Sequence, residues 1–441
     1  MMNKGVKRGV LAALFAAALI GTGMMSMAEE LANETPGVTV EADENSATGY
    51  KVSFTYYNDQ ATNVSLRGSF SFYTEDDENI KGYGENLSED DKFGNHMVNP
   101  EDWSKDKKLH HIQDEGFITP MEKDEETGAW TYSMELTGGW YLYKYDVSYD
   151  DGKNYESITD PENLPYCNSL GASQTRSQFY VPYDAEKQPE YDDWTFATPA
   201  EQEEDRGRIV RKTYVNADGT ARPLEVYLPA HYDENREEPY KVLYLSHGGG
   251  GDEGDWFYQG HAGNIMDRLA AEGECEEFIM AAVDNAAINW ELPVMVDELH
   301  NYLVPFMEAE FNVSKEAEDR AYAGLSMGGG RTSHLLFNDP TYFGYYGIFS
   351  VGGTEFFDPR DDYSDLKIPT IYLGVGFGDW AYREISMYGD EDISSLGIAK
   401  LFDEQGITYN GGNGYYIAKG AHDWYTWTEM MHDFLVTTLW K

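Results

Sequence analysis

Hydrophobic and polar positions follow two different patterns along the chain. Over residues 49–182, short stretches alternate apolar with polar residues, as at Val52, Phe54 and Tyr56, and turn residues separate these stretches. Such alternation predicts strands with one buried face, and their close spacing is typical of an antiparallel β-sandwich. Residues 74–116 interrupt the pattern with polar and charged sequence, which predicts a long loop insertion in this domain.

Residues 207–441 have the pattern of an α/β domain. Short apolar runs such as Lys241–Ser246 and Thr370–Val375 alternate with segments of helical periodicity such as Pro293–Glu310. This alternation predicts a mostly parallel sheet covered by helices on both faces. The other expected strands are Phe278–Val283, Arg320–Ala323, Tyr345–Phe349 and Tyr415–Ile417, and the other expected helices are Gly328–Phe337, Ile393–Phe402 and Trp424–Trp440. Residues 183–206 are acidic and contain prolines, which predicts a linker that need not hold the two domains in fixed contact.

The first 28 residues have the pattern of a secretory signal peptide. Basic residues precede the apolar run Val10–Ile20, and Ser26 and Ala28 offer a small-residue cleavage site. We therefore expect cleavage near Ala28, secretion of the protein, and a flexible leader over residues 29–48. The apolar run is too short for a comfortable membrane span, so we expect no membrane anchor.

Composition narrows the possible partners. The 441 residues include 79 Asp and Glu against 32 Lys and Arg, which gives a net charge of −47. That balance argues against nucleic acid as a partner and disfavours anionic membranes and polyanionic substrates.

The only two cysteines, Cys167 and Cys275, lie in different expected domains. A disulfide needs Cα atoms within about 7 Å, so we expect two unrelated thiols.

One short motif points to nucleophilic catalysis. Residues Gly324–Gly328 have the spacing G-x-S-x-G, directly after an expected strand and before an expected helix. In that setting Ser326 would occupy a tight strand-to-helix turn with its hydroxyl exposed, and the helix N-terminus would direct partial positive charge at the reacting centre. The alternative is a glycine-rich turn without a catalytic role, which the flanking strand and helix disfavour.

A serine nucleophile needs a general base, and in this chain order the base follows the serine. Only His334, His422 and His432 lie beyond Ser326. His334 falls in the helix that follows the motif and would face away, and His432 lies among apolar residues in the last helix. His422 lies between the last strand and the last helix, where a base-bearing loop is expected, so we assign the base to His422.

The acid that orients this base is less sharply defined. Asp379 lies just past the strand Thr370–Val375, and a carboxylate at that end of a sheet strand can reach the histidine. Asp390, Glu391 and Asp392 are competitors in a polar loop. We expect Asp379, and the competing trio stays open.

An oxyanion hole needs two backbone N–H donors, one of them directly after the nucleophile, at Met327. The second should come from a loop after an earlier strand, and the glycine-rich Ser246–Gly251 is such a loop. No Lys-Ser or Lys-Thr pair follows these glycines, so a phosphate-binding loop is excluded. The chemistry requires no cofactor and no metal ion, and we expect neither.

Together these motifs resemble carbohydrate esterase family 1, the esterase-D/feruloyl esterase branch of the α/β-hydrolases. The resemblance rests on His247–Gly251 with Asp255–Phe257, on Asp284-Asn285, Glu298–Val313 and Ala323–Gly330, and on Gly420–Trp424 with Trp427. It implies an α/β-hydrolase fold over residues 207–441, with Ser326, Asp379 and His422 as nucleophile, acid and base. It also implies Met327 and either Gly248 or Gly249 as oxyanion donors.

The N-terminal domain resembles the immunoglobulin-like carbohydrate-binding modules of family 48. This resemblance rests on Val64–Gly68, on Pro120-Met121 with Trp130, and on Trp140–Tyr145. Aromatic faces can stack on sugar rings, but alternate aromatic residues in a strand more often form core and cross-strand pairs. Carbohydrate binding and a packing or cleft-rim role both stay open.

The resemblance implies a secreted serine esterase that removes feruloyl or acetyl groups from xylan-type plant polysaccharides or their ester-bearing oligosaccharides. Trp256, Trp290 and Trp424 lie near the expected catalytic loops and are candidate substrate contacts. One alternative is a hydrolase of siderophore-type or other small esters, which the same fold also supports. Another is a carbohydrate-binding protein without catalytic activity.

Overall fold

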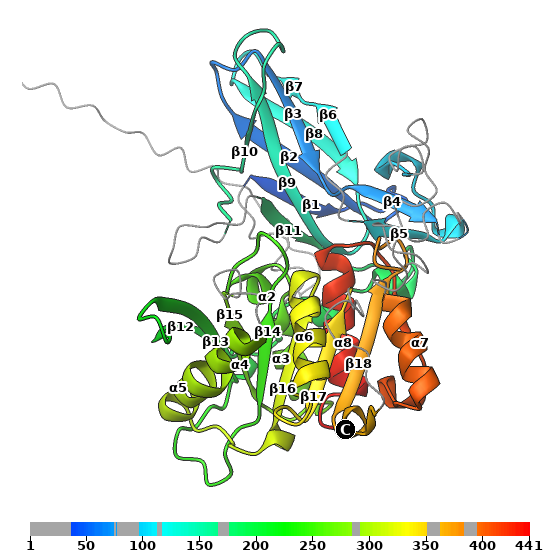
Figure 1. Cartoon of the computed structure of the whole chain (residues 1–441). Coiled ribbons are helices and arrows are strands. Elements are labelled where there is room, and N and C mark those ends of the chain that lie inside the picture. Colours follow the sequence, from blue (N-terminus) through cyan, green and yellow to red (C-terminus); the bar gives the residue numbers. More distant parts are fainter. Residues whose placement is uncertain are drawn as a thin grey trace, which may run out of the picture.

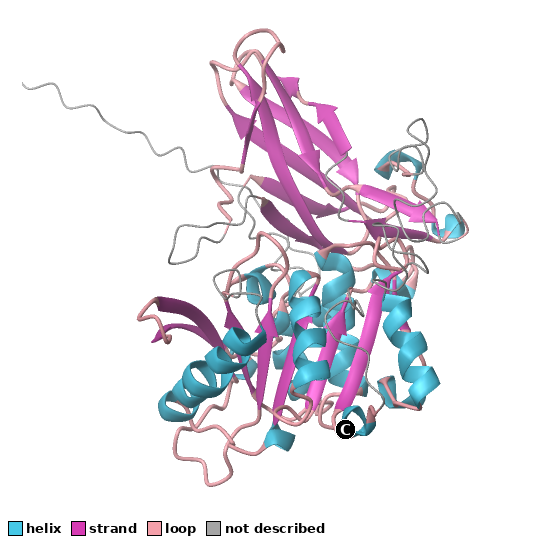
Figure 2. Cartoon of the chain, viewed as in Figure 1, coloured by secondary structure: helices cyan, strands magenta, loops and turns pink. Residues whose placement is uncertain are grey.

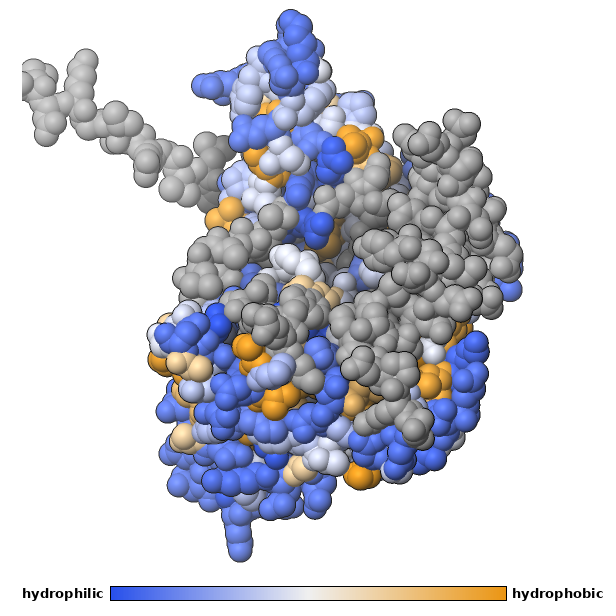
Figure 3. All heavy atoms as spheres, in the orientation of Figure 1, coloured by the Kyte–Doolittle hydropathy of each residue, from blue (hydrophilic) through white to orange (hydrophobic). Residues whose placement is uncertain are grey.

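The computed structural model describes residues 37–74, 76, 97–112, 117–165, 176–284, 292–350, 362–382 and 395–441. These residues form a β-rich N-terminal domain that stands on an α/β domain (Figure 1). Figure 2 shows that the long helices lie around the sheet of the α/β domain, whereas the N-terminal domain consists mainly of strands. The visible surface of the described residues is largely hydrophilic, with scattered small hydrophobic patches (Figure 3).

The N-terminal domain contains two antiparallel sheets. One has the order β1-β2-β8-β7, formed by Val38–Ala42, Tyr50–Tyr57, Ala129–Glu135 and Glu122–Lys123. The other has the order β10-β9-β3-β6, formed by Glu156–Ile158, Gly139–Ser148, Asn63–Gly68 and Phe117–Pro120, and β11 (Ser177–Val181) also pairs with β9. Alternate side chains of β2, including Val52 and Phe54, are buried in the core between the sheets, as the period of two requires. The expectation of a flexible leader over residues 29–48 is wrong for Val38–Ala42, because β1 pairs with β2 and buries Val38 and Val40 in the same core.

The interval expected to be a loop insertion contains regular structure. Strand β4 (Ser71–Thr74) pairs with β5 (Leu109–Ile112) in a two-stranded antiparallel ribbon, the β4–β5 ribbon, and 3₁₀ turns occupy Pro100–Asp102 and Lys105–Lys107. Every residue of β5 is buried. The expectation of a continuous loop is therefore wrong for this part, because a short buried run is hidden in strongly charged sequence. Residues 75, 77–96 and 113–116 lie outside the described residues.

The α/β domain is built on an eight-stranded sheet. Its order is β12 (Arg208–Val215), β13 (Ala221–Leu228), β15 (Ile279–Val283), β14 (Val242–Ser246), β16 (Arg320–Leu325), β17 (Tyr345–Phe349), β18 (Thr370–Gly376) and β19 (Tyr416–Ala418). The pairs β12–β13 and β13–β15 are antiparallel, and the pairings from β15 through β19 are parallel. The carboxyl ends of the parallel strands therefore meet at one edge, where catalytic loops gather in this kind of fold.

Helices cover both faces of this sheet. On one face α4 (Leu292–Glu298), α5 (Val304–Glu310), α6 (Met327–Asn338) and α7 (Ser395–Gln405) pack on strand residues such as Val242 and Tyr244. On the other, α3 (Ala262–Ala271) and α8 (Trp424–Thr437) pack on Leu243 and Leu245, and the four-residue α2 (Asp255–Tyr258) adds Trp256 and Phe257. A π-helical turn over Leu299–Leu303 separates α4 from α5, within the segment expected as one helix. Among the helices of the described residues, none has the length and apolar character needed to cross a membrane.

Residues 183–206 are packed rather than extended. They form 3₁₀ turns at Glu190–Asp192, Thr195–Ala197 and Glu203–Asp205. Trp194 is 3% exposed and belongs to the core cluster that contains α3 and α8. The Arg268 guanidinium on α3 donates hydrogen bonds to the carbonyl oxygens of Thr198 and Pro199, both 2.9 Å long. The expectation of a loosely attached linker is corrected, because Trp194 and Ala197 are buried in the core of the α/β domain.

Candidate active site

Ser326 occupies a strained turn between β16 and α6. Its backbone has φ 51° and ψ −119°, a conformation that a non-glycine residue adopts only when the surroundings enforce it. A Cβ added at Gly324 would lie 2.4 Å from the Gly328 carbonyl oxygen, and one at Gly328 would lie 2.3 Å from the Ser246 carbonyl oxygen. Both glycines are therefore required by close backbone approach, which is the physical basis of the G-x-S-x-G spacing.

The structure brings the three residues expected as nucleophile, base and acid into one hydrogen-bonded line. The Nε2 atom of His422 lies 2.8 Å from Ser326 Oγ, and its Nδ1 atom lies 2.9 Å from Asp379 Oδ1. Asp379 is 0% exposed, and the same oxygen accepts a 2.8 Å hydrogen bond from the Ala381 N–H. With the proton on Nδ1 held by Asp379, Nε2 is free to accept the serine proton.

Backbone hydrogen bonds tie the loop that carries Asp379 to the loop that carries His422. The N–H of Phe377 donates to the carbonyl of Ala418 at 2.9 Å, and the N–H of Gly378 donates to that of Gly420 at 2.8 Å. After His422, Asp423 caps α8 by accepting a 2.9 Å hydrogen bond from the Thr426 N–H. The acid and base loops thus form one connected unit at the carboxyl edge of the sheet.

Two aromatic residues that the sequence did not single out as substrate contacts flank His422. The ring of Trp380 lies 4.6 Å from the His422 ring, centroid to centroid, and is half-buried. The ring of Trp427 meets His422 edge-on at 5.1 Å, and its indole N–H donates a 2.8 Å hydrogen bond to Ser350 Oγ. Trp380 directly follows Asp379 in the sequence, which is the one signal that could have identified it.

Backbone groups suited to an oxyanion hole lie beside the serine. A Cβ added at Gly248 would lie 3.3 Å from Ser326 Cβ, so this glycine passes next to Ser326. Met327 is the first residue of α6, where a helix leaves its N–H groups without intrahelical partners. The buried His247 holds the glycine loop, since its Nδ1 lies 2.7 Å from the Gly248 carbonyl oxygen. At Gly249 an added Cβ would meet nothing within 4 Å.

The tryptophans expected to contact substrate are placed differently. Trp256 is 1% exposed and Trp424 is 8% exposed, and their rings pack edge-on at 5.3 Å within the core. Both rings are therefore part of the core and have little surface left for a substrate, which corrects the expectation. Trp290 lies outside the described residues, as do Asp390, Glu391 and Asp392, the competitors for the acid.

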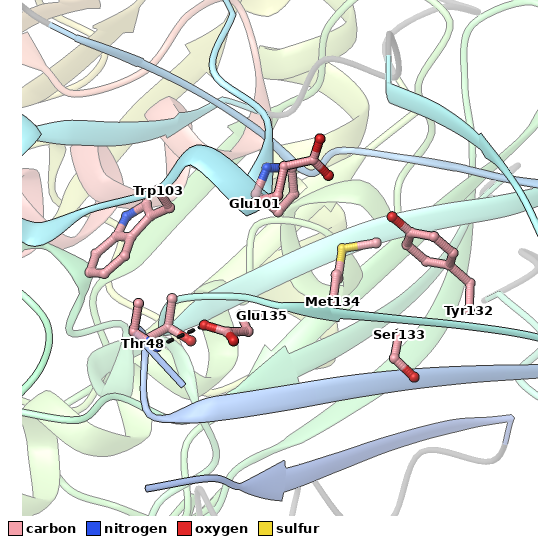
Figure 4. Close-up of a pocket in the computed structure, with 9 residues that line it drawn as sticks. Thr48, Glu101, Trp103, Tyr132, Ser133, Met134 and Glu135 are labelled. Atoms are coloured by element: carbon pink, nitrogen blue, oxygen red, sulfur yellow. Dashed lines mark hydrogen bonds between the residues drawn. The ribbon is translucent and has the colours of Figure 1, made fainter. Parts of the chain in front are cut away.

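Other candidate features lie away from this line of residues. A pocket of about 310 Å³ lies in the N-terminal domain, and Figure 4 shows Glu101 and Trp103 on one side of it and Tyr132 and Met134 on another. Its lining residues are all from the N-terminal domain, so it is separate from the line Ser326–His422–Asp379.

Within the described residues, no cluster of His, Cys, Asp or Glu could hold a metal ion, and Cys275 is a free thiol. Cys167 lies outside them.

Comparison with known proteins gives consistent matches. The Esterase family model, described as "Putative esterase", matches residues 216–437. A curated endo-1,4-beta-xylanase/feruloyl esterase of Xylanibacter ruminicola is 29% identical over 70% of this chain, and endo-1,4-beta-xylanase Y of Acetivibrio thermocellus is 32% identical over 50%. The matches cover 40% and 22% of those proteins, so the chain spans less than half of their length.

A solved structure of similar extent also matches. The enterobactin esterase of Shigella flexneri, determined in the presence of enterobactin, is 12% identical with a TM-score of 0.54. The match covers 92% of this chain and 97% of that one, which indicates a shared fold across both domains. The matched family segment spans half of this chain and contains Ser326, Asp379 and His422. The chain therefore belongs to the esterase family.

Proposed function

We propose that the protein is a serine carboxylic-ester hydrolase that acts through an acyl-enzyme. The observation that carries this proposal is the hydrogen-bonded line Ser326–His422–Asp379 at a strained strand-to-helix turn. His422 Nε2 takes the proton from Ser326 Oγ as this oxygen attacks the ester carbonyl carbon. Asp379 holds the imidazole in the correct tautomer and stabilises the imidazolium that forms.

The remaining steps use the same groups. The N–H groups of Met327 and of Gly248, or alternatively Gly249, would stabilise the tetrahedral oxyanion, where losing one donor of this kind costs about 2.7–4 kcal/mol. His422 then gives its proton to the departing alcohol, leaving the acyl group on Ser326. A water molecule, deprotonated by His422, attacks the acyl carbon, and the acid leaves as the serine recovers its proton.

For the substrate, we propose feruloyl or acetyl esters on xylan-type plant polysaccharides or on oligosaccharides derived from them. The names of the two curated relatives support a role in xylan breakdown, and an uncharged polysaccharide suits a protein of net charge −47. The half-buried Trp380 beside His422 offers an aromatic face near the reacting centre. Secretion, on the basis of residues 1–28, would bring the enzyme to an extracellular polymer.

A siderophore-type ester is the second candidate, because a structure of an enterobactin esterase matches both domains. One assay series separates the two. The full-length protein is incubated with arabinoxylan, and released ferulate and acetate are measured beside hydrolysis of a cyclic catecholate triester. Release of ferulate or acetate supports the polysaccharide assignment, and turnover confined to the triester supports the alternative. If no ester is hydrolysed and a serine-directed fluorophosphonate does not label Ser326, the hydrolase proposal is wrong.

A further inference from the structure

The loop that carries His422 is packed against the N-terminal domain on its upstream side. Ala421, directly before the base, is 8% exposed and lies in one apolar cluster with Tyr73 of β4 and Ile112 of β5. Tyr73 and Ile112 are themselves almost fully buried. Figure 1 shows the β4–β5 ribbon over the carboxyl end of β18, the strand that leads to Asp379. The ribbon therefore packs against the carboxyl edge of the sheet near the end of β18.

The acid loop touches the same ribbon. Phe377, two residues before Asp379, belongs to the same apolar cluster, and its ring lies parallel to that of Tyr73 with centroids 6.1 Å apart. Because the Phe377 N–H is bonded to the Ala418 carbonyl, Tyr73 packs on the unit formed by the acid and base loops. Tyr73 thus packs beside both the loop that carries Asp379 and the loop that carries His422.

The residues that follow His422 also pack against β5 and against the segment 183–206. Tyr425, three residues after His422, is buried, and the His111 ring of β5 meets its ring edge-on at 4.9 Å. The Trp194 indole N–H donates a 2.9 Å hydrogen bond to the Tyr425 hydroxyl. His111 is fixed in turn, since its Nε2 lies 2.6 Å from the Ser69 carbonyl oxygen.

We propose that the β4–β5 ribbon is a positioning element of the active site, a role that rests on the proposed esterase function. Tyr73, His111 and Ile112 act through Phe377, Ala421 and Tyr425 to hold Asp379 and His422 in line with Ser326. A loop is free to sample many conformations, and a misplacement of about 1 Å can cost a hundredfold in rate. The N-terminal domain is therefore required for hydrolysis even of small esters that have no polysaccharide to bind.

A second part of the interface provides a matched control. The Trp140 ring of β9 stacks on His261 at 4.0 Å, and the Gln178 side chain of β11 donates a 2.9 Å hydrogen bond to the Tyr258 carbonyl. These contacts join the N-terminal domain to α2 and to the start of α3, neither of which carries a residue of the catalytic line. Trp140→Ala removes a large interface contact and leaves the ribbon in place.

The test uses the full-length chain with 4-nitrophenyl acetate and methyl ferulate, and measures kcat and KM separately. We expect Tyr73→Ala and Ile112→Ala to lower kcat tenfold to a hundredfold, with KM changed less than about threefold, because a positioning role affects the alignment of Asp379 and His422 more than the binding of a small ester. The rate at which a fluorophosphonate labels Ser326 should fall by a similar factor. Tyr73→Phe keeps the ring, so its kcat should stay within about twofold of the wild-type value. The kcat of Trp140→Ala should stay within the same range.

Thermal unfolding of each variant checks that the chain is folded at the assay temperature. If Tyr73→Ala does not fold, Ile112→Val serves instead, with an expected loss in kcat of about twofold to fivefold. Wild-type kcat in folded Tyr73→Ala and Ile112→Ala, or an equal loss in Trp140→Ala, would overturn the positioning role while leaving the esterase proposal intact. An inactive wild-type protein whose Ser326 is not labelled would instead remove the esterase proposal, and this inference with it.

Discussion

The indole N–H of Trp194 donates a 2.9 Å hydrogen bond to the Tyr425 hydroxyl and joins two residues 231 positions apart. The two rings also pack with centroids 4.0 Å apart. Trp194 lies in the segment that its sequence marks as a linker, and Tyr425 lies in the first turn of the last helix. A fragment that starts at residue 207 would therefore lose part of its own core, so the α/β domain depends on residues before its first strand.

Replacing Trp194 should destabilise the protein strongly. Trp194→Ala removes a buried ring and leaves a cavity, which typically costs about 3–5 kcal/mol. Trp194→Phe keeps most of the ring burial but deletes the bond to Tyr425, so we expect a smaller loss of about 1–2 kcal/mol. Urea unfolding of the two variants measures both values. A loss below about 1 kcal/mol for Trp194→Ala would show that this segment is not part of the core.

Ser326→Ala should abolish ester hydrolysis while leaving the fold intact. The change removes the nucleophile, and comparable substitutions in serine triads lower kcat by about a millionfold. Turnover of 4-nitrophenyl acetate and the thermal unfolding midpoint are measured on the same preparation. Residual activity above a few per cent of wild type would exclude Ser326 as the nucleophile.

Asp379→Asn should lower kcat by about 10³–10⁴-fold. The amide cannot stabilise the imidazolium of His422, and it favours the tautomer in which Nε2 carries the proton and cannot accept one. Asp390→Asn and Asp392→Asn are the controls, and we expect both to change kcat by less than about threefold. A collapse of kcat confined to either control would assign the orienting acid to that residue instead.

His111 should make the protein less stable in acid. Burial lowers the pKa of His111 to about 4, against an ordinary value of 6.5. As the pH falls below 6.5 the unfolded chain binds a proton that the native chain does not, so the free energy of unfolding decreases between pH 6.5 and about pH 4. The effect at pH 4 is on the order of 3 kcal/mol.

His111→Gln removes this titration and keeps an N–H donor for the Ser69 carbonyl. The difference in unfolding free energy between pH 7.5 and pH 4.5, measured with urea, should therefore be smaller in this variant than in the wild type. His231→Gln is a control of opposite sign: the hydrogen bond to Glu277 raises the pKa of this exposed histidine, so its removal should slightly enlarge that difference. An identical pH dependence in His111→Gln and wild type would show that His111 is not held neutral by burial.

Local patterns in the sequence predicted many of the strands and helices and the turn at Ser326. Alternation at Val52 and Phe54 predicted a strand with one buried face, and the structure shows that strand. The spacing around Ser326 predicted the tight turn, because only glycine fits where backbone atoms approach at Gly324 and Gly328. The choice of His422 followed from its place between the last strand and the last helix, and the structure puts its Nε2 beside Ser326 Oγ.

The tertiary structure alone decided how distant segments meet. A periodic pattern shows which face of an element is buried but not which element covers it, so neither the stacking of Tyr73 on Phe377 nor the burial of Trp194 could be predicted. For the same reason the sequence made Trp256 look like a substrate contact, whereas the fold buries its ring. The sequence determined the candidate catalytic residue types and their order. Only the folded chain brings Ser326, His422 and Asp379 together and decides which distant residues pack around them, because such contacts leave no local pattern.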